Sequence, residues 1–401
     1  MKLLTFSTLY PSTARPIHGV FVETRLRELL KSGEVDARVV APVPWFPFRH
    51  GGFGAYAQHA RTPPQEERSG IEVLHPRYIA VPKVGMTPAP WLLAQAVKPV
   101  LAKLLQRFDF DCIDAHYLYP DGVAAVILGR HFRKPVVLTA RGSDVTQIPA
   151  YRLPRAMIRW AARNAARLIT VSRALKDDLV ALGVEGERIT VLRNGVDLER
   201  FQPLAREAVR AELGLQRTTL LSVGHLIPRK AHDLPIRALE LLPDTDLLIV
   251  GDGPERASLV ALAARLGVSA RVRFVAAVPQ QQLPRYYSAA DVLVLASSRE
   301  GWANVLLEAM ACGTAVAASN VGGAAELVTA PAAGVLFDQR TPAALARAIQ
   351  QLMAAKPDRA STRHHAEQFS WSATTRGQLE LFTSVLMGGS ASAEILPAQA
   401  G

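Results

Sequence analysis

Two glutamates, Glu300 and Glu308, lie eight positions apart in the C-terminal half of the chain. An apolar run at 291–296 predicts a strand before them, a glycine-containing turn follows, and we expect a helix to begin near Ala303. Glu300 would then lie in the loop and Glu308 on the helix, so the two carboxylates could contact opposite ends of one ligand. Ligands collect beyond the carboxyl ends of parallel strands, and helix starts favour phosphate, so a sugar nucleotide fits this arrangement.

A second candidate segment runs from Ser222 to Lys230 and contains His225, Arg229 and Lys230 after a predicted strand end. A phosphate could approach a helix start there, whereas Lys230 taken alone would be an exposed helix lysine. The run Gly-Asp-Gly-Pro-Glu at 251–255 lacks the third glycine and the downstream carboxylate of a dinucleotide fingerprint. We interpret its glycines as tight-turn residues.

The first half of the chain offers polar residues after three predicted strands. Gly19 could let a diphosphate approach the backbone, or could simply be a helix-entry glycine. His116 closes a strand, where it could contact a substrate or be a satisfied core histidine. Arg141 could hold a phosphate or an acceptor, with Asp144 fixing it through a salt bridge, or the two could form a plain structural pair.

The elements that must position these residues are short apolar runs alternating with helical segments, the pattern of parallel sheets flanked by helices. We expect strands at 2–7, 36–41, 112–116, 135–140, 168–172 and 189–192, and, after a restart, at 219–224, 246–251, 272–275, 291–295, 315–319 and 334–337. Helices are expected at 19–32, 90–107, 121–131, 151–166, 173–182, 254–266, 341–354 and 369–386. The fold class is therefore α/β with two sheet domains. Residues 42–90 are expected to form a loop-rich insertion.

Composition limits the class of protein. A chain of 401 residues with 49% hydrophobic and 20% charged residues is a well-packed protein of about two domains. Cys112 and Cys312 lack metal-ligand spacing and are expected to be buried thiols in a reducing compartment. A membrane-spanning helix needs roughly 18 to 20 uninterrupted apolar residues, and no stretch of the sequence approaches that length. We therefore expect a cytoplasmic protein.

The net charge of +11 predicts an anionic partner. Arginines recur every three or four positions and would line one side of a helix: Arg152, Arg155, Arg159, Arg163 and Arg167. They form either a solvated outer face or a surface attracted to an anionic membrane. Interleaved aromatic residues for base stacking are lacking, so nucleic acid is not expected as a partner.

Taken in order, these motifs resemble the family 4 retaining glycosyltransferases, whose GT-B fold has two Rossmann-like domains with parallel sheets facing across a cleft. The resemblance covers roughly residues 1 to 385 and looks closest to members that make bacterial cell-surface polysaccharides. It implies four parts of the chain. Residues 1–197 would form the acceptor domain and residues 198–370 the nucleotide-sugar donor domain. Residues 371–387 would form a helix crossing back to the first domain, and residues 388–401 a disordered tail.

The resemblance also implies roles for the donor-side residues. Glu300 would accept hydrogen bonds from sugar hydroxyls and Glu308 from the ribose, while Ala303, Asn304 and Val305 would offer backbone amides. Lys230 would clamp the diphosphate. His225 replaces the family's arginine and supplies less charge, for which Arg229 could compensate.

On the first domain, Gly19 would approach the diphosphate, and His116 would touch the transferred sugar. Arg141 and Asp144 would share that crevice.

The expected activity is a metal-independent, retaining hexosyl transfer without a cofactor. The donor would be a nucleotide-diphosphate sugar, and the acceptor a saccharide or a lipid-linked saccharide, with the protein possible at the inner face of the membrane. The alternatives are a sugar-nucleotide epimerase of the same fold and a non-catalytic carbohydrate-binding protein. A glycosidase is disfavoured because its two carboxylates must flank one glycosidic bond.

Overall fold

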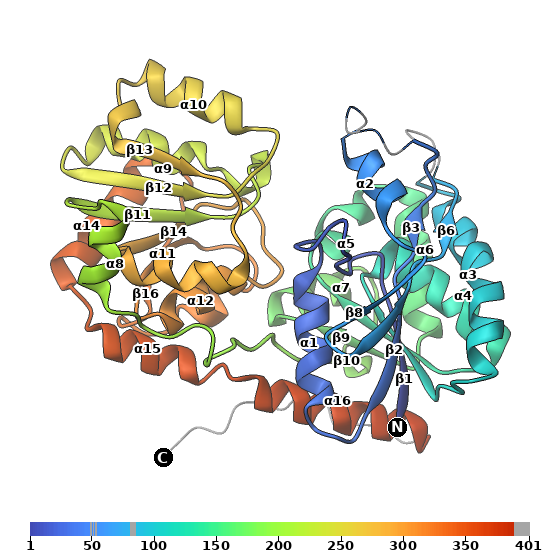
Figure 1. The fold of residues 1–401 in the computed structure, drawn as a ribbon. Helices are drawn as coiled ribbons and strands as arrows, with labels where there is room; N and C mark the ends of the chain where they lie inside the picture. Colours follow the sequence, from blue (N-terminus) through green and yellow to red (C-terminus); the bar gives the residue numbers. More distant parts are fainter. Residues whose placement is uncertain (49, 51, 53, 81–85, 389–401) are drawn as a thin grey trace, which may run out of the picture. The chain divides into compact units, whose positions relative to one another are not determined.

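The structure is a computed structural model that describes residues 1–48, 50, 52, 54–80 and 86–388. The chain forms two compact units (Figure 1). Unit 1 comprises Met1–Arg193 and the chain from Ala373 onward, and unit 2 comprises Asn194–Ser372. Most of the tail expected to be disordered, from residue 389 on, lies outside the described residues.

Unit 1 is built on an eight-stranded sheet with the order β10-β9-β8-β7-β1-β2-β5-β4. Its strands are β1 Lys2–Phe6, β2 Asp36–Val40, β4 Gln65–Arg68, β5 Ile71–Leu74, β7 Cys112–His116, β8 Val136–Ala140, β9 Arg167–Thr170 and β10 Ile189–Val191. All neighbours pair in parallel except β4 and β5, which form an antiparallel hairpin. The central strands β7 and β8 are buried along their whole length, as expected of a parallel sheet covered on both faces.

The helices of unit 1 flank this sheet (Figure 1). They are α1 Val20–Leu30, α2 Ala55–Arg61, α3 Ala89–Leu105, α4 Val123–Phe132, α5 Ser143–Thr146, α6 Arg152–Asn164, α7 Arg173–Ala181 and α16 Trp371–Leu386. Most of α16 belongs to unit 1, where Leu381 and Phe382 pack in one core cluster with Leu3, Val22 and Val39. Residues at the two ends of the sequence therefore share a core.

The segment 42–90 contains more regular structure than its composition predicted. It includes the hairpin β4–β5, the parallel pair β3 Val43–Pro44 and β6 Arg77–Tyr78, and helix α2. Ile71 and Val73 are buried and alternate with less buried residues, and Ser69 and Gly70 have positive φ in the tight turn. The alternation was visible in the sequence, but prolines and glycines on both sides obscured it.

Unit 2 has a six-stranded, fully parallel sheet with the order β13-β12-β11-β14-β15-β16. Its strands are β11 Thr218–Val223, β12 Thr245–Val250, β13 Val272–Val275, β14 Val292–Leu295, β15 Val316–Ser319 and β16 Gly334–Phe337. Its helices are α8 Arg206–Leu213, α9 Asp233–Ala238, α10 Arg256–Arg265, α11 Leu283–Ala289, α12 Asn304–Ala311, α13 Ala324–Leu327, α14 Pro342–Ala355 and α15 Arg359–Glu367. This is the strand order of a doubly wound Rossmann-like domain.

The strands and helices expected from periodicity are present, with ends that differ by one or two residues. One detail is wrong: Arg167 does not continue the arginine row of α6, because the helix ends at Asn164 and Arg167 begins β9. Among the described residues, no helix combines the length and the apolar character needed to cross a membrane.

Replacing Phe382 by alanine tests the role of α16 in the core of unit 1. The side chain is fully buried, so Phe382→Ala should destabilise unit 1 by about 3–5 kcal/mol. Hydrogen exchange of the full chain should show lost amide protection in β1 and β2, with β11 and β12 of unit 2 little changed. Met387→Ala, at an 81% exposed position near the end of the same helix, is the matched control. Unaltered protection of β1 in Phe382→Ala would contradict the packing described.

Candidate functional site

The sheet of unit 2 has a topological switch point between its neighbouring strands β11 and β14. The chain leaves β11 toward β12 on one side and leaves β14 toward β15 on the other. Leu220 of β11 pairs with Val292 of β14, so the loops after both strands start side by side. Open α/β sheets bind ligands at this point, beyond the carboxyl ends of the strands.

Glu300 lies in the loop between β14 and α12, as the sequence predicted, and only 9% of the residue is exposed. Its Oε1 accepts a hydrogen bond from Lys230 Nζ at 2.6 Å, and its Oε2 lies 3.4 Å from Arg229 Nη1. Burial raises the pKa of the Glu300 carboxyl, but Lys230 and Arg229 outweigh that effect and the net pKa is lowered. Glu300 is therefore an ionised carboxylate held by two cations.

The loops that carry these three residues are also joined by hydrogen bonds to backbone carbonyl groups. Ser298 N donates to Arg229 O at 2.8 Å, and Arg229 Nη1 donates to Arg299 O at 2.8 Å. A Cβ on Gly322 would lie 1.8 Å from Glu300 O, and Gly322 has a φ of +53°. Glycine at this position therefore lets a third segment close over the Glu300 backbone.

Glu308 lies on α12 and is also buried, at 8% exposed. Its Oε2 accepts a hydrogen bond from the Tyr287 hydroxyl at 2.6 Å. Burial is the largest effect and raises the pKa of Glu308, opposed by the Tyr287 hydrogen bond and by Arg200. The alternative of an ordinary surface helix acid is excluded. No sequence pattern pointed to Tyr287, which comes from α11.

The start of α12 is fixed by its neighbours. Ala303 is the N-cap residue, Leu306 N bonds to Ala303 O, and Asn304 N donates to Trp302 O at 3.2 Å. To bind a ligand, the Asn304 amide would have to share or exchange this hydrogen bond. Val305 lies in the first turn of α12, where backbone amides lack intrahelical acceptors. Trp302 is buried and donates its indole N–H to Asn194 O at 3.0 Å, so it is a packing residue.

The glycine-rich turn at 251–253 packs on the loop after β11. Leu226 N donates to Asp252 O at 2.9 Å, and Glu255 N donates to Leu226 O at 3.1 Å. This agrees with the interpretation of a structural tight turn. His225 lies one residue earlier and is exposed.

In unit 1, His116 ends β7 and is 1% exposed. Arg141 Nη2 donates to His116 Nδ1 at 2.6 Å, so the ring proton lies on Nε2, which is 3.1 Å from Asp114 Oδ2. Burial lowers the pKa of His116 to about 4, with Asp114 opposing and Arg141 adding to the shift. Both ring nitrogens are engaged within the protein, which matches the alternative of a satisfied core histidine; contact with a sugar would require Arg141 to move.

Asp144 acts on Arg141 in two ways: its charge opposes the lowering of the Arg141 pKa by burial, and its carboxylate binds the backbone. It accepts hydrogen bonds from the backbone amides of Leu118 at 2.8 Å, Gly142 at 2.7 Å and Arg141 at 3.1 Å, while the Arg141 guanidinium reaches His116. Asp144 therefore fixes the backbone after β8.

Gly19 is the N-cap residue of α1 and has a φ of +70°. A Cβ there would lie 2.3 Å from Leu9 O, so glycine is required for the loop after β1 to pack on the helix start. Gly19 therefore acts as a helix-entry glycine, which is one of the two roles that the sequence left open.

Asp121 is a buried residue that the sequence analysis missed. It accepts hydrogen bonds from Thr8 N at 2.8 Å and from Thr8 Oγ1 at 2.9 Å, and it lies 3.4 Å from Ser7 Oγ. Burial raises the pKa of Asp121 to about 7, opposed by these hydrogen bonds. The residue ties the loop after β1 to the segment after β7, two strands that are neighbours in the sheet.

Two Rossmann-like domains, the second with a cation–carboxylate cluster at its switch point, agree with the GT-B fold of glycosyltransferases that the sequence resembles. The family described as "Glycosyltransferase Family 4" matches residues 55–200, and "Glycosyl transferases group 1" matches residues 205–369.

Relatives and solved structures agree with these matches. TuaC of Bacillus subtilis (strain 168), whose name assigns it to teichuronic acid biosynthesis, is 34% identical over 337 residues, which are 82% of this chain and 83% of TuaC. Sucrose-phosphate synthase from Thermosynechococcus elongatus superposes with a TM-score of 0.80 at 22% identity, over 97% of this chain and 99% of that one. Anabaena HepE in complex with UDP-glucose gives a TM-score of 0.71 at 21% identity, over 96% and 99%.

The chain belongs to the family 4 glycosyltransferases with the GT-B fold, and its function is glycosyl transfer. The resemblance seen in the sequence is thereby confirmed.

Replacing Asp121 by asparagine should change the pH dependence of stability. Folding raises the Asp121 pKa from 3.8 to about 7, so between these values the folded state keeps a proton that the unfolded chain releases. Wild-type stability relative to Asp121→Asn should therefore fall as pH rises from 5 to 7, by up to about 1.4 kcal/mol per pH unit.

Urea unfolding of both proteins at pH 5, 6, 7 and 8 measures this difference, and other titrating groups cancel because both proteins carry them. A difference independent of pH would show that Asp121 is ionised throughout.

Proposed function

We propose that the protein is a retaining, metal-independent hexosyltransferase that moves a sugar from a nucleotide-diphosphate donor to a saccharide or lipid-linked acceptor in cell-surface polysaccharide biosynthesis. The observation that carries the proposal is the pairing of the buried Glu300 with Lys230 and Arg229 at the switch point of unit 2. The name of TuaC supports the role in polysaccharide biosynthesis.

The cluster suits a ligand that carries both negative charge and hydroxyl groups. Lys230 and Arg229 are paired with Glu300, and a diphosphate entering the site would offer them a second, stronger partner. As the cations turn to the phosphate oxygens, Glu300 becomes available as an acceptor for sugar hydroxyls. Glu308, positioned by Tyr287, is the proposed acceptor for the ribose. The complexes of Anabaena HepE with UDP and UDP-glucose make uridine nucleotides the first donors to test.

The proposed chemistry needs no covalent glycosyl-enzyme. The bond between the anomeric carbon and the phosphate oxygen breaks, the acceptor oxygen bonds to the same face of that carbon, and the acceptor proton passes to the leaving diphosphate. Lys230 and Arg229 would stabilise the negative charge that develops on the diphosphate. With the donor bound, Glu300 would accept hydrogen bonds from sugar hydroxyls and Glu308 is tied to Tyr287, so neither carboxylate is assigned the role of a nucleophile.

The acceptor-side proposal places the protein at the inner face of the membrane. Arg152, Arg155, Arg159 and Arg163 of α6 are all exposed, and Tyr151 and Leu153 at the start of that helix are each 58% exposed. Cations beside exposed apolar side chains are the composition of a surface that binds an anionic bilayer. A lipid-linked acceptor would be presented at such a surface.

A thermal-shift screen with UDP, GDP, ADP and their sugars tests the donor site. A ligand at 100 times its Kd stabilises the folded state by about 2.7 kcal/mol, which is a shift of several degrees. Lys230→Ala should remove the shift produced by the nucleoside diphosphate. Glu300→Gln should keep that shift, because Lys230 is freed for the phosphates, and should lower transfer about 100-fold or more.

Glu240→Gln is the matched control, since Glu240 is exposed on the same unit and stands outside the cluster. Transfer by Glu300→Gln at the wild-type rate would refute the proposed role, and release of free sugar without an acceptor would point to a hydrolase.

The membrane proposal predicts that Arg155→Glu with Arg159→Glu weakens sedimentation with vesicles of anionic phospholipid. The loss should be at least tenfold at low salt and smaller at high salt, because the attraction is screened. The double variant Arg265→Glu and Arg347→Glu makes the same charge change on exposed positions of unit 2 and serves as the control. Equal binding of the two double variants would identify α6 as a solvated face.

A further inference from the structure

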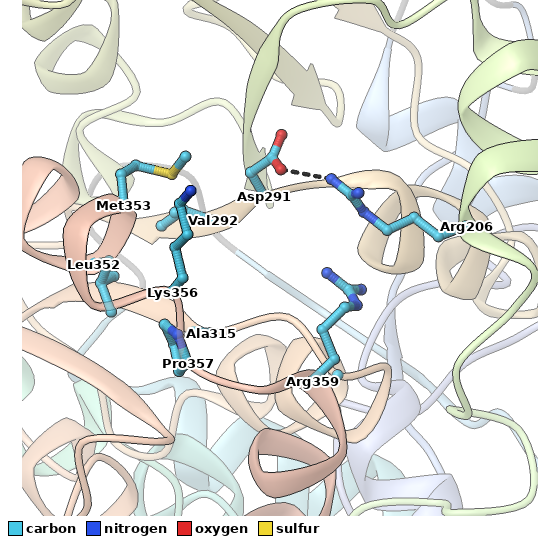
Figure 2. Close-up of a pocket in the computed structure, with 10 residues that line it drawn as sticks. Arg206, Asp291, Val292, Ala315, Leu352, Met353, Lys356, Pro357 and Arg359 are labelled. Carbon is cyan, nitrogen blue, oxygen red and sulfur yellow. Dashed lines mark hydrogen bonds and ion pairs between the residues drawn. The ribbon is translucent and has the colours of Figure 1, made fainter.

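A pocket lies on unit 2 among the residues drawn in Figure 2. It is lined by residues at the amino ends of β14 and β15, whereas the Glu300 cluster follows the carboxyl end of β14. Its volume is about 230 Å³, which is enough for a ligand larger than inorganic phosphate.

Basic side chains from three elements border this pocket. Arg206 comes from α8, Lys356 follows the end of α14, and Arg359 begins α15. Figure 2 shows them around the same space as Asp291, which is the one acidic residue of the lining.

Asp291 cannot neutralise all of these charges. Its Oδ1 lies 2.5 Å from Arg206 Nη2, and its Oδ2 lies 3.2 Å from Arg210 Nη1 and accepts a hydrogen bond from Thr219 N at 2.8 Å. Arg206 Nη1 also lies 3.3 Å from Glu207 Oε1, so Asp291 and Glu207 together balance the charges of Arg206 and Arg210. The charges of Arg359 and Lys356 remain in excess.

Arg359 is held in place by neutral groups. Its Nη1 donates to Ala290 O, and its Nη2 donates to Ser288 O at 2.9 Å and to Thr314 Oγ1 at 2.7 Å. Burial lowers the pKa of Arg359, and Arg206 lowers it further while Asp291 opposes the shift. This is a rigid guanidinium in a region of unbalanced positive charge, where an anion would be stabilised.

Arg206 carries an unused donor, and one wall of the pocket is apolar. Arg206 Nε is buried and has no hydrogen-bond partner among the described residues. Val292, Ala315, Leu352 and Met353 line the same pocket. Guanidinium groups match phosphate oxygens, and the apolar side can accept a carbon framework.

We propose that this pocket is a binding site for a small phosphomonoester, such as a sugar phosphate, separate from the nucleotide-sugar site. The phosphate would lie among Arg206, Lys356 and Arg359. The carbon framework would lie against the apolar wall. The proposal does not depend on the proposed function, because it uses none of the residues at the switch point.

Calorimetric titration of the full chain with inorganic phosphate and with glucose 6-phosphate tests the proposal. Lys356→Asn removes the exposed rim charge, and asparagine tolerates the positive φ of 42° at this position, so the variant should fold. It should weaken binding of both anions about tenfold, and glucose 6-phosphate should bind more tightly than inorganic phosphate to the wild type. Arg347→Gln removes one charge from an exposed position on α14 outside the pocket and should leave both affinities unchanged.

The active-site cations could also bind phosphate, so Lys230→Ala is titrated in parallel. Binding lost in Lys230→Ala and kept in Lys356→Asn would place the anion at the donor site and overturn the proposal. Undetectable binding of both anions to the wild type at millimolar concentration would overturn it as well.

Discussion

The pairing of Lys230 with Glu300 is the constraint on which the candidate site of unit 2 depends. A carboxylate with a side chain only 7% exposed must be neutralised locally, because an unpaired buried charge costs several kcal/mol. The two residues belong to loops that follow neighbouring strands at the switch point, so their contact fixes both loops at once. Backbone bonds from Ser298 to Arg229, and the close packing of Gly322 on Glu300, hold the arrangement from the other sides.

Unit 1 also has buried polar groups at the ends of its strands, and each is held by its own hydrogen-bond partners. His116 is neutral and bridges Arg141 and Asp114, while Asp144 is held by backbone amides. Asp121 has hydroxyl and amide donors around it and a pKa near 7. The first unit buries charge as well: burial raises the pKa of Asp114, but His116, Arg25 and Arg141 outweigh that effect and the net pKa is lowered.

Much of the fold could be predicted from the chain alone. Continuous apolar runs such as Val136–Ala140 identify strands buried on both faces, and the restart of alternation after residue 194 indicates a second sheet. The hairpin β4–β5 was missed because its short strands lie among prolines and glycines. Tyr287 and Asp121 were missed because their partners are distant in sequence, Asp121 contacting Thr8 across 113 positions.

The sequence by itself determined the order of the elements and the placement of the candidate groups after strand ends, because hydrophobic periodicity and glycine positions are local properties. It also determined the family, through several motifs in the right order. Only the tertiary structure decided which groups are paired: Glu300 with Lys230, Glu308 with Tyr287, and His116 with Arg141. Protonation follows from burial and from contacts between distant segments, and no local pattern of residues contains that information.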